Sequence, residues 1–473
     1  MTTPTSVLVP VLAALKAALK DAVLTGADIP VRNEKDWSPL PPQKPLAVVR
    51  PADPQGVATA MRICAAHLVA VVPQGGLTGL AGGARPIEDA VVISLERLTG
   101  IEEIDRDSAT MTVRAGTPLE TVQRAADDAG FFFALDLGAR GSCAIGGNVS
   151  TNAGGNRVLR YGMMREMVLG LEVVLPDGTL MTSLNKMLKN NAGYDLKQVF
   201  IGSEGTLGII TRVVLRLFPK PACTMIAICG LESYAKVLQL LHTGRRDLGP
   251  QLSAFEVMWP DYWHVATKRI PNIRDPLTSQ HPFYVLIEAQ GNDATSDPAR
   301  FEQVLANALE AGCVQDAIVA QSLAENKAFW GIRDAAGEFV QVLGKHSSFD
   351  IGLSVRDMDR FAGECRQALS DEIPGCESMF YGHIADGNMH IVAHVPAANP
   401  QPAKQIDALV YRLVRQYGGT VSAEHGIGLT KKPYLPFTRS AEEMALMRTI
   451  KTALDPKNLL NPGKVISIAS DQS

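Results

Sequence analysis

Three glycine-rich segments constrain the fold of this chain more than any other feature. They occupy residues 74–85, 138–155 and 202–208, and the third leads into the β-branched run 209–218. Glycine adopts positive φ angles and lets backbone N–H groups approach an anion closely. One such segment alone is typical of an ordinary surface turn. Three of them predict an extended, diphosphate-bearing ligand that backbone groups of several segments contact.

The residues around the first glycine loop alternate between strand and helix patterns. Three apolar, β-branched runs predict strands, at residues 46–50, 69–73 and 90–95. Residues 54–67 have the spacing of a helix. Residues 7–23 are apolar but carry three charged side chains, so we expect an amphipathic helix there rather than a signal peptide.

Two common nucleotide-binding motifs are absent. No G-x-G-x-x-G sequence follows a strand pattern, so a Rossmann site for NAD is not supported. Gly463 and Lys464 are followed by Val465 rather than by Ser or Thr, so the chain has no P-loop. The diphosphate-bearing ligand must therefore be bound in another way.

Composition excludes several other classes of protein. A chain of 473 residues, 46% hydrophobic and 20% charged, is expected to fold into two or three globular domains. Its net charge of −4 and its lack of Lys/Arg clusters argue against a nucleic-acid partner. No run approaches the ~20 apolar residues of a transmembrane helix. The seven cysteines are scattered without a C-x-x-C pair, which argues against an iron–sulfur cluster and fits a reducing cytoplasm.

Histidines near the C-terminus form a candidate metal site. Residues 382–390 contain His383, His390 and, between them, the dipeptide Asp-Gly at 386–387, a strong signal for a two-residue hairpin turn. Such a hairpin places the two histidines opposite each other on one face. With the Glu-His pair at 424–425 they predict a divalent metal site. The alternative is two unrelated histidines beside a turn.

The composition changes after residues 219–221, where the glycine loops end and helical patterns take over. We therefore expect a second, substrate-capping domain. The expected order is an N-terminal helical segment at 1–41, a first domain at 42–221, the capping domain at 222–420, and a C-terminal segment at 421–473. The last segment is expected to return to the first domain and complete the active site.

These motifs resemble those of the FAD-dependent D-2-hydroxyacid dehydrogenases, of the vanillyl-alcohol oxidase and p-cresol methylhydroxylase type. The resemblance runs from about residue 42 to 466 and rests on the glycine loops, on residues 382–390 and 423–426, and on Asn-Pro-Gly-Lys at 461–464. It implies an α+β fold: a PCMH-type FAD-binding domain of two α+β subdomains and a ferredoxin-like antiparallel-sheet cap domain. Covalently flavinylated relatives have a histidine where this chain has Leu77, so we expect non-covalent FAD.

The resemblance also implies which residues contact the cofactor. They belong to the glycine loops and their surroundings: Pro73, Gly75, Gly76, Leu77, Thr78, Gly79, Leu80, Ser142, Gly146, Gly147, Asn148, Thr151, Asn152, Gly154, Gly155, Glu204, Gly205, Gly208, Ile210 and Asn461.

Oxidation of a 2-hydroxy acid removes a hydride from Cα and a proton from the hydroxyl group. A divalent metal, most simply Zn²⁺, favours the alkoxide, and two imidazoles with one carboxylate leave a coordination position open. Successive residues of an extended segment point to opposite sides. We therefore assign His383, His390 and Glu424 to the metal and His425 to the proton, as the resemblance also implies.

Arg333 occupies the position of the family's carboxylate-binding arginine, and a planar bidentate donor suits that role. A surface salt bridge with Asp334 is the alternative. Asn388 is expected to hydrogen-bond the substrate oxygen, unless it is only a turn residue. D-2-hydroxyglutarate dehydrogenases have a lysine where this chain has Ser348, although Lys345 lies nearby in the sequence.

The favoured substrates are therefore D-lactate or another D-2-hydroxy acid, with D-2-hydroxyglutarate or D-malate as alternatives. The electron acceptor is expected to be external: a quinone, an electron-transfer flavoprotein or a cytochrome. We expect a homodimer in the cytoplasm or at the periphery of the inner membrane. Rival interpretations are a lactone-oxidising flavoprotein or non-redox ether-lipid synthase of the same fold, and a regulatory subunit without activity.

Overall fold

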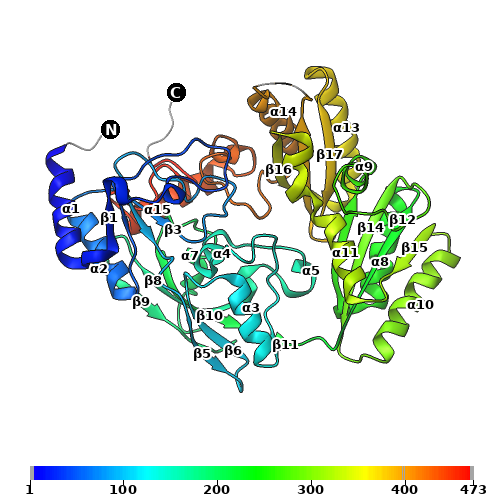
Figure 1. The fold of residues 1–473 in the computed structure, drawn as a ribbon, viewed down its shortest axis with the longest axis horizontal. Coiled ribbons are helices and arrows are strands. Elements are labelled where there is room, and N and C mark those ends of the chain that lie inside the picture. The colour runs from blue at the N-terminus through cyan, green and yellow to red at the C-terminus, as the bar shows by residue number, and fades with distance from the viewer. Residues whose placement is uncertain (1–4, 397, 399, 469–473) are drawn as a thin grey trace. The chain divides into compact units, whose positions relative to one another are not determined.

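The computed structural model describes residues 5–396, 398 and 400–468, and the chain divides into two compact units (Figure 1). The first unit contains Met1–Gly155, Gly162–Pro219 and Glu424–Ser473. The second contains Lys220–Ala423 together with the short segment Asn156–Tyr161. In the described part of the chain, no helix is both long enough and apolar enough to cross a membrane.

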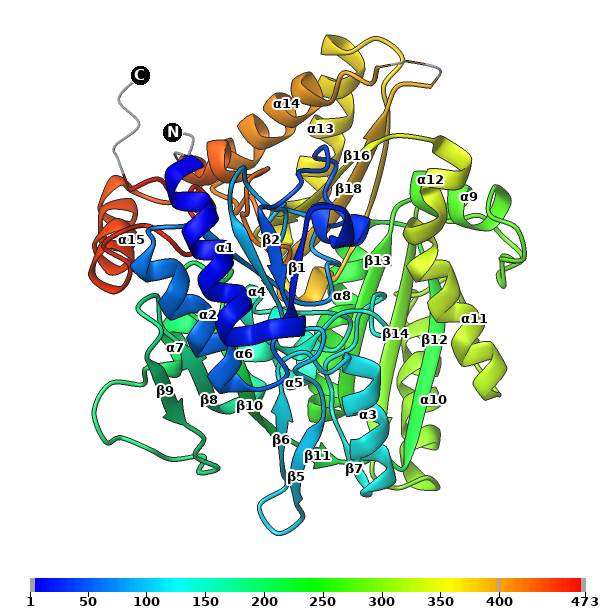
Figure 2. The same ribbon diagram turned by 60° about the vertical axis from the view of Figure 1, so that its left-hand side comes forward.

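The first unit has a small and a larger sheet. The four-stranded sheet has the order β1-β2-β4-β3, with strands at Val23–Thr25, Ala47–Val49, Val91–Ser94 and Val71–Gln74. The five-stranded sheet has the order β5-β6-β10-β8-β9, with strands at Ile101–Asp105, Thr110–Arg114, Ile209–Arg216, Val168–Val174 and Leu180–Ser183 (Figure 2). A short pair joins β7 (Phe131–Phe132) to β11 (Phe218–Pro219).

The helices of the first unit connect and cover these sheets. They are α1 (Thr5–Leu19), α2 (Pro54–Ala66), α3 (Leu119–Asp128), α4 (Ile145–Thr151), α6 (Met164–Met167), α7 (Lys197–Phe200) and α15 (Ala441–Leu454). The predicted helices at 7–23 and 54–67 correspond to α1 and α2, and the three predicted strands to β2, β3 and β4. Asp53 caps α2, because its carboxylate accepts a hydrogen bond from the Gly56 N–H at 2.8 Å.

The second unit contains one seven-stranded antiparallel sheet of order β15-β12-β14-β13-β17-β18-β16. Its strands are at Asp316–Val319, Cys223–Leu231, Phe283–Gly291, Leu252–Met258, Glu377–Gly382, Asn388–His394 and Ser347–Gly352. The helices are α5 (Val158–Tyr161), α8 (Tyr234–Asp247), α9 (Pro260–Lys268), α10 (Ser296–Glu310), α11 (Leu323–Arg333), α12 (Phe339–Leu343), α13 (Met358–Glu372) and α14 (Ala403–Gln416).

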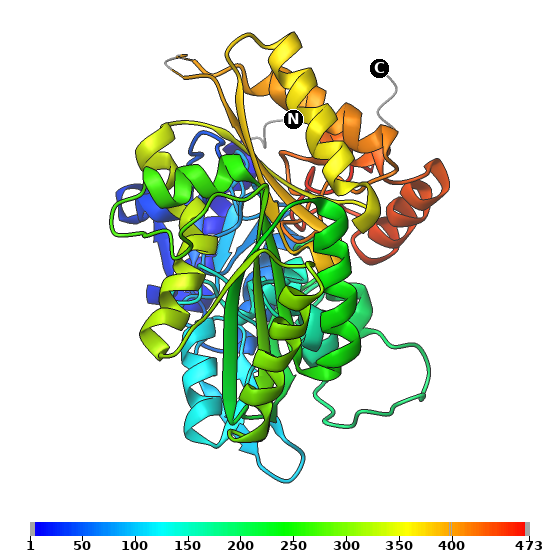
Figure 3. The same ribbon diagram turned by 90° about the vertical axis from the view of Figure 1, so that its right-hand side faces the viewer.

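Helices lie along both faces of the seven-stranded sheet (Figure 3). On one face, side chains of α9, α11 and α12 pack with the strands in an apolar core that includes Tyr262, Phe329 and Phe339. These three helices cover the face of the sheet on which Tyr381 and His390 lie. The mixed α+β architecture predicted from the sequence is confirmed, including an antiparallel sheet domain.

Candidate functional site

The three glycine loops meet one another in the first unit. Gly76 lies so close to the second loop that a Cβ atom would come within 2.0 Å of the Ser142 carbonyl oxygen. Only glycine fits at that position. The third loop contacts the second through a hydrogen bond of 2.7 Å from the Glu204 N–H to the Ser150 carbonyl oxygen. The loops are therefore one assembly rather than three separate turns.

The C-terminal segment binds to the glycine loops through Asn461 and Lys464. Asn461 Nδ2 donates hydrogen bonds to the carbonyl oxygens of Gly83 (3.1 Å) and Glu204 (2.8 Å). Lys464 is 1% exposed, and its Nζ donates to the carbonyl oxygens of Gly83 (2.8 Å) and Arg85 (2.6 Å). Burial lowers the pKa of Lys464 to about 7, although Asp36 and Glu204 oppose that shift. The C-terminal segment thus links the first glycine loop to the third.

The Glu204 carboxylate has a structural task that the sequence did not predict. It accepts hydrogen bonds from the N–H groups of Ile427 (2.7 Å) and Gly428 (2.8 Å). Gly426 has φ +80°, and a Cβ there would lie 2.8 Å from the same carboxylate. Burial raises the pKa of Glu204, while the two N–H groups act in the opposite direction. Glu204 therefore fixes the backbone just after Glu424 and His425.

The geometry of the loops fits the FAD that the resemblance implies. Leu77, Asn152 and Glu204 all have positive φ, which is uncommon for residues other than glycine and typical of ligand-binding turns. A Cβ at Gly79 or Gly147 would meet no protein atom within 4 Å, so both border open space. The buried Oδ1 of Asn148 has no hydrogen-bond partner. The loops thus combine space with an unused polar atom, as a cofactor cradle requires.

All residues predicted to contact the cofactor lie in the first unit, on or beside these loops. Besides those already discussed, they are Pro73, Gly75, Thr78, Leu80, Gly146, Thr151, Gly154, Gly155, Gly205, Gly208 and Ile210. The Gly155 N–H also donates a hydrogen bond to Glu424 Oε2 at 3.0 Å. This bond ties the end of the second loop to the segment that carries Glu424 and His425.

In the second unit, strand register gathers polar residues on one face of the sheet. His390 pairs with Tyr381 on one side and with Asp350 on the other. Met258 pairs with Tyr381, and Glu256 lies two residues before Met258. Paired residues and residues two apart share a face, so all five side chains belong to the same face.

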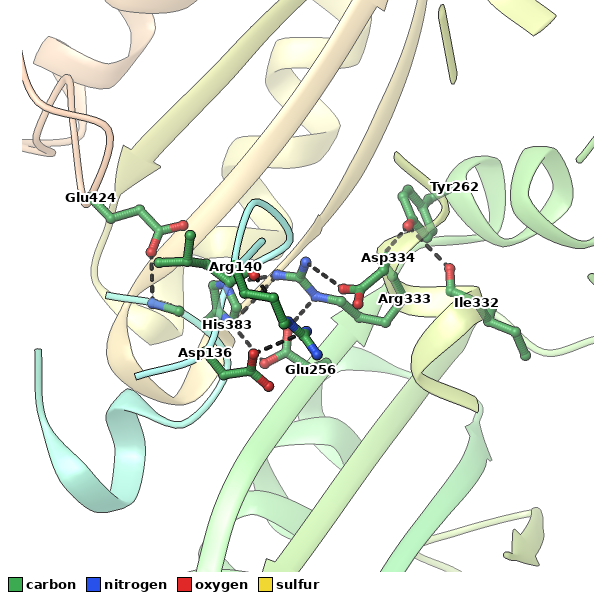
Figure 4. Close-up of polar contacts among 11 residues, drawn as sticks. Asp136, Arg140, Glu256, Tyr262, Ile332, Arg333, Asp334, His383 and Glu424 are labelled. Atoms are coloured by element: carbon green, nitrogen blue, oxygen red, sulfur yellow. Dashed lines mark hydrogen bonds and ion pairs between the residues drawn. The ribbon is translucent and has the colours of Figure 1, made fainter. Parts of the chain in front are cut away.

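Arg333, Glu256 and His383 form a closed triangle at this face (Figure 4). Arg333 Nε donates to Glu256 Oε2 at 2.8 Å, and Arg333 Nη2 donates to His383 Nε2 at 2.7 Å. His383 Nδ1 donates to Glu256 Oε1 at 2.7 Å. Burial alone would raise the pKa of Glu256, but His383 and Arg333, which both contact the carboxylate, hold it at about 2. Arg333 is thus buried in an ion pair rather than forming only a surface salt bridge with Asp334, which lies 3.6 Å from Nη1.

His383 and His390 differ as candidate metal ligands. Both ring nitrogens of His383 are hydrogen-bonded, Nδ1 to Glu256 and Nε2 to Arg333, so a metal ion at Nε2 would have to displace the Arg333 guanidinium. The rings of His383 and His390 lie 5.4 Å apart between centroids. Asp350 and His390 offer ligand atoms within 4.8 Å of each other. In the first unit, Glu424 and His425 also offer ligand atoms within 4.8 Å of each other.

Asn388 is held in one orientation by Asp350. Its Nδ2 donates to Asp350 Oδ1 at 2.7 Å and to the Ile351 carbonyl oxygen at 3.2 Å. The other carboxylate oxygen of Asp350 accepts hydrogen bonds from Ser422 Oγ (3.1 Å) and the Ala423 N–H (3.2 Å). A flipped amide would turn its oxygen toward the carboxylate, so the orientation is fixed. Asn388 Oδ1 is left buried without a partner and is suited to accept a hydrogen bond from a hydroxyl group.

The predicted hairpin at Asp386-Gly387 is wrong in its register. His390 pairs with Tyr381 instead of His383, because β17 ends at Gly382 and a 3₁₀ turn, η7 (Ile384–Asp386), follows. A two-residue type I′ turn needs positive φ at both central residues, and only Gly387 has it, at 89°. His383 precedes the turn outside the strand, yet its ring still lies near that of His390.

Sequence reasoning missed Glu256 and Glu288, and gave Asp350 no role. Each is a fully buried carboxylate in the seven-stranded sheet. The available signal was a single acidic residue inside an otherwise apolar strand run, because a buried charge is retained only where it is paired. Ser348, two residues before Asp350, pairs with Val392 and is exposed, as is Lys345.

Comparisons with known protein families agree with the geometry. Residues 45–183 match the family model described as an FAD binding domain, and residues 220–465 match the C-terminal domain of FAD linked oxidases. A D-2-hydroxyglutarate dehydrogenase of Xanthomonas citri pv. viticola is 39% identical over 439 residues, covering 91% of both chains. A mitochondrial D-2-hydroxyglutarate dehydrogenase of Arabidopsis thaliana is 38% identical over 431 residues, covering 91% of this chain and 77% of the relative.

Solved structures share the fold at low sequence identity. p-Cresol methylhydroxylase with substrate bound has a TM-score of 0.79 at 17% identity, with 98% of both chains covered. Alkyldihydroxyacetonephosphate synthase has a TM-score of 0.74 at 17% identity, with 98% of this chain and 85% of the other covered. At such identities the likeness concerns the fold alone.

Proposed function

The chain belongs to the FAD-dependent D-2-hydroxyacid dehydrogenase family, and from this premise we propose that it oxidises a D-2-hydroxy acid to the 2-oxo acid. The observation that carries the proposal is the buried polar cluster of Arg333, His383, His390 and Asn388 in the second unit. FAD, when bound, supplies the acceptor for the hydride from Cα. The residues of this chain bind and orient the acid and move its hydroxyl proton.

Each residue of the cluster is proposed to have a distinct role. Arg333 binds the C1 carboxylate, since a guanidinium offers planar, charge-assisted donors. Asn388 Oδ1 accepts a hydrogen bond from the substrate hydroxyl, which is supported by its lack of a partner. His425 takes the hydroxyl proton. Glu204 holds the backbone beyond His425 and thereby steadies the base.

We propose a divalent metal, Zn²⁺ first, held by His383, His390 and Glu424. The donor set is imidazole and carboxylate, which suits a catalytic zinc site, and Asp350 adds a carboxylate beside His390. A divalent cation bound there would lower the pKa of a hydroxyl group. The hydrogen bond from His383 Nδ1 to Glu256 orients the ring, and metal binding at Nε2 would require the Arg333 guanidinium to give up its hydrogen bond there.

The remaining features are proposed on chemical grounds. Electrons leave through an external acceptor, namely a quinone, an electron-transfer flavoprotein or a cytochrome. Among D-2-hydroxy acids we favour D-lactate or a longer monocarboxylic acid, because Ser348 replaces the family lysine.

A homodimer in the cytoplasm or at the periphery of the inner membrane remains our proposal. Relatives from Arabidopsis and zebrafish are named as mitochondrial, so cell fractionation is the test of location.

The function is tested by anaerobic reduction of the flavin. The purified protein should be yellow, and D-2-hydroxy acids should bleach it whereas their L-enantiomers should not. Acid precipitation should release the colour into the supernatant, because Leu77 provides no ring nitrogen for a covalent bond. A flavin that no 2-hydroxy acid bleaches would overturn the activity. Colour that stays with the precipitate would overturn only the non-covalent attachment.

A further inference from the structure

Glu288 and the groups that donate hydrogen bonds to it form a buried polar node in the second unit. The proposed chemistry does not use this node. It is 0% exposed in β14 and accepts two hydrogen bonds from Arg157, from Nε at 2.8 Å and from Nη2 at 3.1 Å. Ser253 Oγ donates at 2.7 Å and Trp330 Nε1 at 3.0 Å. Burial alone would raise the pKa of Glu288, but Arg157 and these donors lower it. The carboxylate is therefore charged, and both of its oxygens are occupied.

The node lies on the face of the sheet that carries the candidate site. Glu288 pairs with Ala254, two residues before Glu256, so both glutamates belong to one face. Trp330 and Arg333 are three residues apart in α11 and therefore lie on the same side of that helix. Figure 2 shows α11 running along β12 and β14. Helix α11 is thus joined to the sheet by two polar contacts, Trp330 with Glu288 and Arg333 with Glu256.

The same node also holds the segment 156–161. Next to Arg157, Arg160 Nη1 donates to the Gln290 carbonyl oxygen at 2.5 Å, and Tyr161 OH donates to Gln290 Oε1 at 2.8 Å. This segment packs in the second unit, although the residues before and after it in the chain belong to the first. It directly follows the glycine loop that ends at Gly155. Glu288 therefore connects that segment to helix α11.

We propose that Glu288, acting through Trp330, is a positioning residue that sets the place of the Arg333 guanidinium for the substrate carboxylate. The proposal rests on the proposed role of Arg333. A hydrogen bond to a buried carboxylate is directional, so it fixes the rotation and height of α11 more narrowly than apolar packing does. The position of Arg333 three residues later is thereby fixed as well.

The test replaces Trp330 by phenylalanine, which removes the indole N–H and keeps an aromatic ring. The KM for the best D-2-hydroxy acid should rise roughly three- to tenfold with kcat changed less than twofold, because ground-state carboxylate binding is weakened. The matched control is Trp259→Phe. Trp259 Nε1 also donates to a carboxylate, Asp359 Oδ1, at 3.0 Å, but it lies outside α11. The control should leave KM unchanged.

A double-mutant cycle distinguishes positioning from general stability. In an Arg333→Ala background, Trp330→Phe should have no further effect on KM, because its effect passes through Arg333. Equal rises of KM in Trp330→Phe and Trp259→Phe would overturn the proposal, as would an unchanged KM in Trp330→Phe. If Arg333→Ala itself leaves KM unchanged, the proposed role of Arg333 fails instead. FAD content and melting temperature, measured for every variant, identify any that fail to fold.

Discussion

At the scale of single residues, buried carboxylates of the second unit hold the polar side chains of the candidate site in fixed orientations. Glu256 fixes both Arg333 and the ring of His383, and Asp350 fixes Asn388. A buried carboxylate without partners would be costly, so each such residue in a sheet indicates a polar neighbour that must be held in place. These carboxylates could not be predicted from the sequence. The histidines and Arg333 belong to recognisable motifs, whereas the place of Glu256 beside them follows only from the register of β13.

His390 gives a prediction at this scale. Replacing His390 by alanine should lower the metal content of the purified protein and reduce turnover by ~10²–10⁴-fold, the usual loss when a charge-stabilising group is removed. FAD should remain bound, because the glycine loops lie in the first unit. Metal analysis, flavin absorbance and initial rates measure the three quantities.

A matched control for that experiment lies four residues further along the same strand. His394 is also buried, and its Nε2 contacts Glu377 Oε2 at 3.2 Å. His394→Ala should keep both metal and turnover. Full turnover of a metal-free preparation would contradict the metal assignment, and equal losses in the two variants would show that β18 tolerates no change.

At the scale of elements, patterns predict strands and helices well but not their register. Elements near the first glycine loop, such as β2 and α2, lie where their apolar patterns place them. The turn at 384–387 was misread because Asp-Gly also suits a 3₁₀ turn closed by a left-handed glycine. The resulting shift is by two residues, and a shift by an even number keeps side chains on the same face of a sheet. The predicted face of His390 is therefore unchanged, although His383 lies outside the strand.

The C-terminal segment gives a prediction at this scale through Lys464. Its pKa is about 7 in the folded chain and near 10.5 when unfolded, because burial disfavours the charged amine. Between these values the unfolded chain binds more protons, so the free energy of unfolding contributed by this group rises with pH. The slope is at most about 1.4 kcal/mol per pH unit. Below about pH 7 the amine is charged in both states and the contribution is constant.

Denaturant unfolding of the first unit, followed by release of flavin fluorescence, measures this slope. Between pH 7 and 9.5, Lys464→Met should gain less stability than the unaltered protein. The exposed Lys189 of the same unit serves as the control, and Lys189→Met should retain the original slope. Parallel pH profiles for the unaltered protein and Lys464→Met would show that Lys464 does not titrate in this range.

At the scale of the whole molecule, the family could be identified from sequence alone because its motifs are spread along the chain. The glycine loops, the histidine segment and the C-terminal Asn-Pro-Gly-Lys sequence come from distant regions, and their co-occurrence is specific. The contacts that join them could not be foreseen. Glu204 reaches Ile427 and Gly428 across more than 200 positions of sequence, and no local pattern encodes that hydrogen bond.

For substrate choice, overall sequence similarity and the residue at position 348 lead to different expectations. Relatives at 38–39% identity are named D-2-hydroxyglutarate dehydrogenases. The family resemblance leads us to propose that Ser348 takes the place of a lysine that meets a second carboxylate. Burying an unpaired carboxylate is unfavourable, so the diacid should have no large advantage over D-lactate or a longer monocarboxylic acid. Ser348→Lys should then raise kcat/KM for D-2-hydroxyglutarate by at least ~10-fold, since a hydrogen bond to a charged group is worth roughly 1.5–3 kcal/mol, and should leave D-lactate unaffected. A steep preference of the unaltered protein for the five-carbon diacid would refute this and direct attention to Lys345, whose replacement by methionine should then abolish the preference.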